Sequence, residues 1–189
     1  MSEHYYQTKE SVEEYIKLAQ GVNGKELIEE LIKYLPPKAS ILEIGSGPGS
    51  DYQILKSYYD ITGSDYSIEF LTRLKQNHPT EVFLQLDAKT LQTDQKFDGI
   101  YSNKVFQHLN DTELKTSFQR QVELLNPGGV ICHSFWKGEG EELFKGLLVN
   151  YQTETSLRKL IEDKFDVLVL EAYKEFEDGD SLLIIGRKK

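Results

Sequence analysis

Five consecutive residues, Gly45-Ser-Gly-Pro-Gly49, form the segment of this chain that most directly suggests a chemical role. An apolar run that carries one acid, residues 41–44, leads into them, and a helix-like segment follows. The pattern predicts a buried parallel strand that ends in a loop rich in glycine. Glycine permits positive φ and lets a ligand lie against bare backbone. The loop alone does not identify the ligand, because several kinds of nucleotide site use similar loops.

Two carboxylates follow the loop at the ends of later strands. Asp65 lies 16 positions after Gly49, at the tip of a strand expected at residues 61–64. A carboxylate there can accept hydrogen bonds from both hydroxyls of a ribose, or it can cap the helix that follows. Asp87 ends a strand expected at residues 82–86 and can accept from an adenine amino group or begin a turn. Both aspartates are therefore candidates for binding an adenosine-like ligand, with the structural alternatives open.

The segments around these residues alternate between strands and helices. Expected strands lie at residues 40–44, 61–64, 82–86, 97–101 and 130–135, and expected helices lie at residues 50–59, 67–77 and 111–125. Helices of this length between strands imply parallel βαβ units, so we expect a doubly wound α/β fold. In such a sheet, ligands bind beyond the carboxyl ends of the strands, where the glycine loop and both aspartates belong.

The two ends of the chain depart from this alternation. Amphipathic helices are expected at residues 11–20, beginning at a capping box of Ser11 and Glu14, and at residues 25–34. Near the C-terminus, the link between two expected strands is too short for a comfortable crossover helix, so that pair should be antiparallel. These strands lie at residues 165–170 and 181–185. We expect one domain with three parts: a helical cap at residues 1–37, a cofactor-binding core at 38–135, and a lid segment with the strand pair at 136–189.

Taken together, these features resemble the class I S-adenosylmethionine-dependent methyltransferases from about residue 40 to residue 135. The residues that resemble the glycine-rich signature of that family are Glu43, Gly45, Ser46, Gly47 and Gly49. Residues 97–102 resemble its fourth strand, and Leu-Leu-Asn-Pro-Gly-Gly at 124–129 resembles the more specific segment before its fifth strand. The resemblance implies a mostly parallel, Rossmann-like sheet of seven strands with the last strand reversed.

The resemblance also implies a cofactor, S-adenosylmethionine, and roles for the residues that follow each strand. Asp65 would bind the ribose hydroxyls, and Asp87 would bind the adenine edge. Tyr66 and Ala88 would flank the adenine ring, and Ser102 would contact the cofactor from the end of the fourth strand. The implied reaction is direct displacement of the sulfonium methyl group by an acceptor atom, which depends mainly on alignment of the two reactants.

The charges near the glycine loop favour this cofactor over a nicotinamide dinucleotide. Glu43 lies inside the strand before the loop and Asp51 just after it. A pyrophosphate prefers a helix N-terminus free of negative charge, whereas S-adenosylmethionine carries no phosphate and two cationic groups. The loop also lacks the three-residue step to the last glycine of the dinucleotide fingerprint. Glu43 has a structural alternative, as a strand acid satisfied by loop amides.

The acceptor is expected to be a small molecule. The fourth strand ends in Ser-Asn-Lys-Val, residues 102–105, and not in the Asn/Asp-Pro-Pro-aromatic signature of enzymes that methylate adenine amino groups. No Pro-Cys nucleophile follows that strand, and Cys132 is misplaced for such a role. The net charge is −9, and no basic cluster is present beyond residues 187–189. This composition argues against a nucleic-acid substrate, because proteins that bind nucleic acids usually present a basic face to the phosphates.

His108, just beyond the fourth strand, is the candidate general base, with a packing or polar loop role as its alternative. His133, inside an apolar strand, is expected to be structural. Four aromatic residues are candidates for covering the acceptor and excluding water: Tyr6, Tyr15, Trp136 and Tyr151. No cluster of His, Cys and carboxylate residues has the spacing of a metal site, so no metal is expected.

Two other functions remain open at this stage: a nicotinamide-dependent oxidoreductase, and a protein that binds the cofactor without catalysis and acts through a partner. The polar N-terminus has no secretory signal pattern, and no apolar run approaches the length of a membrane span, about 18–20 residues. A cytoplasmic location without membrane association is therefore the default expectation. The oligomeric state is not encoded in any motif that we can interpret.

Overall fold

A seven-stranded sheet is the centre of the computed structural model, which describes residues 5–189. The strand order is β3-β2-β1-β4-β5-β9-β8. The strands are β1 (Ser40–Ile44), β2 (Asp60–Asp65), β3 (Phe83–Gln85), β4 (Phe97–Asn103), β5 (Leu125–Trp136), β8 (Phe165–Tyr173) and β9 (Ser181–Lys188). The α-helices are α1 (Lys9–Leu18), α2 (Lys25–Leu31), α3 (Ser50–Leu55), α4 (Ile68–Asn77), α5 (Asp111–Leu124) and α6 (Glu154–Ile161).

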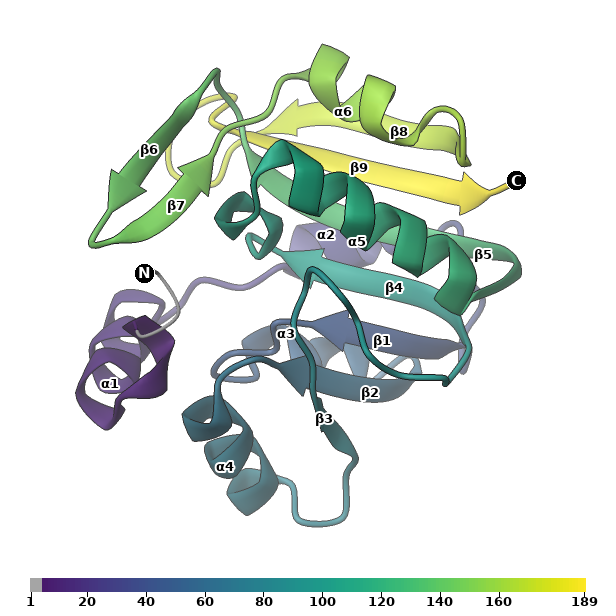
Figure 1. Cartoon of the computed structure of the whole chain (residues 1–189). Coiled ribbons are helices and arrows are strands. Elements are labelled where there is room, and N and C mark those ends of the chain that lie inside the picture. The colour runs from purple at the N-terminus through teal and green to yellow at the C-terminus, as the bar shows by residue number, and fades with distance from the viewer. Residues whose placement is uncertain (1–4) are drawn as a thin grey trace.

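Helices cover both faces of the sheet (Figure 1). On one face, α5 and α6 pack against Leu42, Ile100 and Ile131 of the central strands. On the other face, α2 and α3 pack against the alternate residues, among them Ile41 and Cys132. Because successive side chains of a strand point to opposite faces, these apolar strands supply both cores at once. The free thiol of Cys132 is buried there.

The expected doubly wound topology with a reversed strand is confirmed. β1 pairs in parallel with β2 and with β4, and β4 pairs in parallel with β5. β9, the last strand, pairs antiparallel with both β5 and β8. The strand order reverses at β1, which places a topological switch point between β1 and β4. In open α/β sheets this is the place where ligands bind.

The structure differs from the expected helices in how they begin and end. α1 begins at Lys9, and Thr8 is its N-cap, so the proposed capping box at Ser11 is wrong. The Thr8 hydroxyl accepts the backbone N–H of Ser11 instead. The first turn contains Lys9 and Glu10, polar residues that give no apolar periodicity from which the start could be found. α2 and α3 are both shorter than expected, ending at Leu31 and Leu55.

Three elements between β5 and β8, two strands and a helix, were not expected from the sequence. Residues assigned to a lid loop form a hairpin of β6 (Glu141–Phe144) and β7 (Leu147–Asn150), which pair antiparallel and stand apart from the main sheet (Figure 1). α6 follows, capped by Thr153. Two short 3₁₀ helices also flank the strand ends, η1 (Tyr5–Gln7) and η2 (Phe106–His108). Within residues 5–189, no helix combines the length and the apolar character needed to cross a membrane.

Candidate active site

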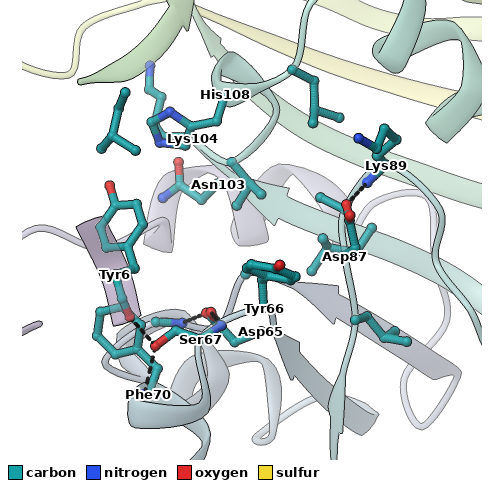
Figure 2. A pocket seen from close by; sticks show the side chains of 18 of the residues that line it. Tyr6, Asp65, Tyr66, Ser67, Phe70, Asp87, Lys89, Asn103, Lys104 and His108 are labelled. Atoms are coloured by element: carbon teal, nitrogen blue, oxygen red, sulfur yellow. Dashed lines mark hydrogen bonds between the residues drawn. The ribbon is translucent and has the colours of Figure 1, made fainter. Parts of the chain in front are cut away.

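A cavity of about 260 Å³ lies at the carboxyl ends of the central strands. Its walls come from the loop after β1, the tip of β2, the loop after β3 and the segment after β4, with η1, α1 and β7 closing it from outside (Figure 2). The sequence-predicted site residues that line it are Tyr6, Tyr15, Gly45, Gly47, Asp65, Tyr66, Asp87, Ala88 and His108. Residues distant in the sequence thus meet at the expected edge of the sheet.

The glycine loop presents its backbone to this cavity. Gly45 has φ +71°, and a Cβ there would lie 2.5 Å from the Val105 side chain. Gly47 has φ +49°, and the nearest atom to an added Cβ is a ring carbon of Tyr15 at 4.0 Å, across the cavity. Gly49 is the N-cap of α3. The loop is therefore a cradle that side chains would fill, which fits the close approach of a cofactor to the backbone.

Asp65 connects the loop to the tip of β2. Its two carboxylate oxygens accept the backbone N–H groups of Gly47 and Ser67, both at 2.8 Å. Ser67, and not Asp65, is the N-cap of α4, so the simple capping role is not what the structure shows. Burial raises the pKa of Asp65 to about 6. Each carboxylate oxygen has a second lone pair, so this side chain at the cavity wall can still accept hydrogen bonds from a ribose.

Glu43 and Ser46 lie beneath the loop, away from the cavity wall. The Ser46 hydroxyl donates to the Glu43 carboxyl group at 2.5 Å, and both residues are buried. Burial raises the pKa of Glu43 to about 8. The structure therefore places these two as supports of the loop and not as groups in contact with a ligand. Asp51 is also occupied, since it accepts from the backbone N–H of Gly24 at 2.6 Å and the Tyr101 hydroxyl at 2.7 Å.

The loop after β3 carries the proposed adenine-edge pair. Asp87 accepts the backbone N–H of Lys89 at 2.7 Å, which is the turn geometry considered as its alternative, and it also lines the cavity. Ala88 lies beside it, and its carbonyl oxygen accepts a hydrogen bond from the Ser117 hydroxyl at 2.6 Å. Tyr66 stands across from this pair with 45% of its surface exposed (Figure 2). Tyr66 and Ala88 therefore both line the cavity, as their expected adenine-flanking roles require.

Ser102 does not line the cavity. It is fully buried, and its hydroxyl contacts His133 Nδ1 at 2.8 Å. His133 Nε2 contacts the side-chain oxygen of Gln121 at 2.8 Å, so Nε2 carries the hydrogen and Nδ1 accepts from Ser102. Burial lowers the pKa of His133 to about 3, so its ring is neutral. Both residues belong to a buried polar network behind the site, which agrees with the structural role expected for His133.

His108 lies in η2 and reaches the cavity. Its Nδ1 is 2.8 Å from the carbonyl oxygen of Leu148 in β7. A carbonyl only accepts, so Nδ1 carries the hydrogen, and the neutral ring has its lone pair at Nε2. Burial lowers the pKa of His108 below its ordinary value of 6.5. The geometry therefore supplies a neutral imidazole at the cavity, with one nitrogen able to accept a proton.

The four aromatic candidates divide into two pairs. Tyr6 and Tyr15 lie at the cavity with their ring centroids 5.3 Å apart, and the Ser67 hydroxyl donates to the Tyr6 carbonyl oxygen. Trp136 and Tyr151 do not line the cavity. Trp136 stacks on Phe176 at 5.9 Å, and the Tyr151 hydroxyl donates to Glu142. Trp136 ends β5 and Tyr151 follows β7, so the two rings flank the hairpin and have their partners outside the cavity lining.

Sequence reasoning missed several residues of the cavity wall. Asn103 ends β4 and Lys104 follows it, so their position at a strand end was the available signal. The Lys104 ammonium is directed away from the cavity toward the Phe135 carbonyl oxygen at 3.0 Å and the Ser181 hydroxyl at 2.6 Å. Burial lowers its pKa to about 8. Leu147 lies on β7 and Phe70 on α4, and neither belongs to a motif that would single it out.

Comparison with known proteins agrees with this geometry. A family model described as a methyltransferase domain matches residues 41–129. The chain is 27% identical over 135 residues to 2-methyl-6-phytyl-1,4-hydroquinone methyltransferase of Synechocystis sp., and 33% identical over 107 residues to trans-aconitate 2-methyltransferase of Escherichia coli. These matches cover 68% and 54% of this chain but only 41% and 39% of the relatives. The chain thus spans about two fifths of the length of these curated relatives.

A solved structure with the same fold covers nearly the whole chain. It is the 1,6-didemethyltoxoflavin-N1-methyltransferase of Burkholderia thailandensis with bound 1,6-didemethyltoxoflavin and S-adenosylhomocysteine, matched with a TM-score of 0.79 and 21% identity. The match covers 95% of this chain and 84% of that one. This match shows that the two chains share the class I methyltransferase fold, and the domain model shows that residues 41–129 match a methyltransferase domain.

Proposed function

We propose that this chain transfers the methyl group of S-adenosylmethionine to a small-molecule acceptor by direct displacement. The observation that carries the proposal is the cavity itself, which brings the glycine cradle, Asp65, Asp87 and His108 to one edge of the sheet. The similar proteins add support, because their names describe methyltransferases of a hydroquinone, of trans-aconitate and of 1,6-didemethyltoxoflavin.

The chain's residues have distinct roles in holding the cofactor. The backbone at Gly45 and Gly47 would face the methionine portion, and Asp65 would accept from the ribose hydroxyls. Asp87 would accept from the adenine amino group, with Tyr66 and Ala88 on the two sides of the ring. When bound, S-adenosylmethionine supplies an electrophilic methyl group on a sulfonium. Glu43, Ser46 and Gly49 support these contacts by fixing the conformation of the loop.

The remaining cavity residues would act on the acceptor. Tyr6 and Tyr15 exclude water from the acceptor end, which favours charge-neutralising displacement of a sulfonium. His108 Nε2 receives the proton that an O–H or N–H acceptor loses. Trp136 and Tyr151, which the structure places away from the cavity, have no part in this proposal. A cytoplasmic location and the single-domain organisation stay predictions.

Acceptor-dependent release of S-adenosylhomocysteine tests this function. The purified protein would be incubated with S-adenosylmethionine and panels of small-molecule acceptors, and S-adenosylhomocysteine would be quantified. We expect release with at least one acceptor class and loss of release in Asp65→Ala. Binding of S-adenosylmethionine without release in any panel would favour a cofactor-binding protein without catalysis. Reduction or oxidation of a nicotinamide dinucleotide by the protein would favour the oxidoreductase alternative.

A further inference from the structure

The end of the cavity away from Asp87 and Lys89 has a distinct chemical character. Figure 2 shows Tyr6 and His108 on the side opposite Asp87 and Lys89. The lining there comes from η1, α1, η2 and β7, through Tyr6, Tyr15, His108 and Leu147. Since the adenine end is proposed to hold the cofactor, this end is where the acceptor would bind. The inference that follows therefore rests on the proposed function.

Rings and an apolar side chain line the acceptor end, together with Gln7 and with Asn103, whose amide is already hydrogen-bonded to Asp51 and Ser134 (Figure 2). Tyr6 and Tyr15 meet edge to face, with an interplanar angle of 89°. The Tyr6 ring is 5.9 Å from the His108 imidazole, again in an edge arrangement. Aromatic rings prefer such edge and offset contacts with other rings. Walls of this kind fit a flat aromatic acceptor better than a flexible aliphatic one.

The positive charges of the cavity wall are committed to protein partners. The Lys104 ammonium lies 3.7 Å above the Trp136 ring, besides its contacts to Phe135 and Ser181. The Lys89 ammonium is 3.0 Å from Glu113, at the adenine end. Among the described lining residues, these two lysines are the only Lys or Arg side chains. An acceptor rich in carboxylates would therefore find no ammonium turned toward it.

The tautomer of His108 limits which chemical groups of an acceptor can be methylated with its help. Its Nδ1–H is held by the Leu148 carbonyl oxygen, so the ring offers Nε2 as a proton acceptor. A neutral O–H or ring N–H retains an electron pair while it carries its proton, so it can attack the methyl group and lose the proton in the same step. An ammonium ion has no such pair and must be deprotonated first, which a base weaker than ordinary imidazole does poorly. A carboxylate acceptor needs no base.

We propose that the acceptor is an uncharged aromatic compound bearing an O–H or N–H group, a phenol or a nitrogen heterocycle, and that the heteroatom of this group is methylated. A bond forms between that atom and the methyl carbon while the carbon–sulfur bond breaks. The electron pair of the broken bond stays on sulfur, which gives neutral S-adenosylhomocysteine. The proton of the O–H or N–H group passes to His108 Nε2.

A panel of ring compounds matched in size tests the acceptor class. The neutral arm contains 2-naphthol, 7-hydroxycoumarin, indole and benzimidazole, and the charged arm contains 2-naphthoate and 2-naphthylmethylamine. S-adenosylhomocysteine release is measured for each with saturating S-adenosylmethionine. We expect turnover in the neutral arm to exceed that in the charged arm by at least about tenfold, a factor typical of one missing charge or hydrogen-bond complement. Faster release with 2-naphthoate or the amine overturns the inference and leaves the proposed function intact.

Binding measurements separate the remaining outcomes. If no compound in either arm is turned over, the same compounds are titrated into the protein saturated with S-adenosylhomocysteine. Binding of neutral-arm compounds that is weakened at least about fivefold in Tyr6→Leu supports the inference, because an aromatic wall contributes that much to a ring contact. Absence of neutral-arm binding overturns it. Failure of S-adenosylhomocysteine itself to bind would instead overturn the proposed function.

Discussion

The Ser117 hydroxyl of α5 donates a hydrogen bond to the carbonyl oxygen of Ala88 at 2.6 Å. Ser117 in turn accepts from the Gln121 amide at 3.3 Å, and Gln121 accepts from His133. With Ser102 donating to His133, every group in this chain has one consistent donor and acceptor role. These hydrogen bonds connect the end of β4, through α5, to the loop proposed to hold adenine, so Ser117 helps to hold that loop in place.

Ser117→Ala should therefore weaken cofactor binding although Ser117 does not line the cavity. Loss of one buried hydrogen bond, about 0.5–1.5 kcal/mol, would lower affinity for S-adenosylhomocysteine by roughly two- to tenfold and raise KM for S-adenosylmethionine more than it lowers kcat. Calorimetric titration and steady-state kinetics measure both effects. Thr116→Ala is the control, since its hydroxyl donates within the same helix to the Thr112 carbonyl oxygen at an exposed position. Equal effects of the two variants would exclude the positioning role.

Gly47→Ala should abolish cofactor binding, an effect larger than the loss of folding stability caused by backbone strain alone. Both Gly47 and Gly179 have positive φ, +49° and +73°, so alanine costs on the order of 1 kcal/mol of stability at either position. Gly179 has open space around its Cβ position and lies in the turn between β8 and β9, far from the loop in the sequence. Urea unfolding and calorimetric titration of both variants separate strain from binding. Unchanged affinity in Gly47→Ala would mean that the cofactor does not approach this loop.

Replacement of Glu43 should change how stability depends on pH. Its folded pKa of about 8 lies above the ordinary 4.5, so between these values the folded protein holds a proton that the unfolded chain has lost. Stability therefore falls as pH rises through this window and levels off above about pH 8. Glu43→Gln keeps an acceptor for Ser46 and should remove this fall, gaining about 1–3 kcal/mol near neutral pH.

Urea unfolding at several pH values within and above this window tests the Glu43 prediction. Glu177→Gln, at an exposed position in the turn before β9, is the matched control and should leave the pH dependence as it is. If the free energy of unfolding shifts equally at every pH in both variants, or keeps the wild-type pH dependence in Glu43→Gln, then Glu43 ionises freely in the folded protein.

His108→Asn should separate catalysis from cofactor binding. Removal of a general base lowers turnover by about 10²–10⁴-fold, whereas affinity for S-adenosylhomocysteine should stay within about twofold. In the wild-type enzyme the rate should decline on the acid side as His108 becomes protonated, with a midpoint below the ordinary 6.5 because burial lowers its pKa. A pH–rate profile of each protein tests this. Retention of the acid decline in the variant would assign it to another group.

The sequence was sufficient for the parts of the site that strand periodicity places. The glycine loop, Asp65 and Asp87 each follow an apolar run, so their arrival at one sheet edge follows from parallel βαβ connections. Periodicity could not predict the hairpin, because all four residues of β6 are exposed and carry no alternation of apolar and polar side chains. For the same reason it could not show that Leu147, and not Trp136 or Tyr151, reaches the cavity.

Burial explains the other difference between expectation and structure. The sequence suggested that Glu43 faces a cationic ligand, but a strand buried on both faces leaves this side chain beneath the loop, paired with Ser46. The side-chain network behind Ser102 depends on a fourteen-residue helix whose polar Ser117 and Gln121 face inward. Their pairing with Ala88 and His133 depends on packing between elements, which spacing along the chain does not reveal.

Parallel calorimetric titration of the purified protein with S-adenosylmethionine, S-adenosylhomocysteine and NAD tests the central claim most directly. The site described here predicts binding of the first two and no binding of NAD, with affinity for S-adenosylhomocysteine lowered by about 1.5–3 kcal/mol in Asp65→Ala, the contribution of a hydrogen bond to a charged group. Binding of NAD alone, or unchanged affinity in the Asp65 variant, would contradict the proposed placement of the cofactor.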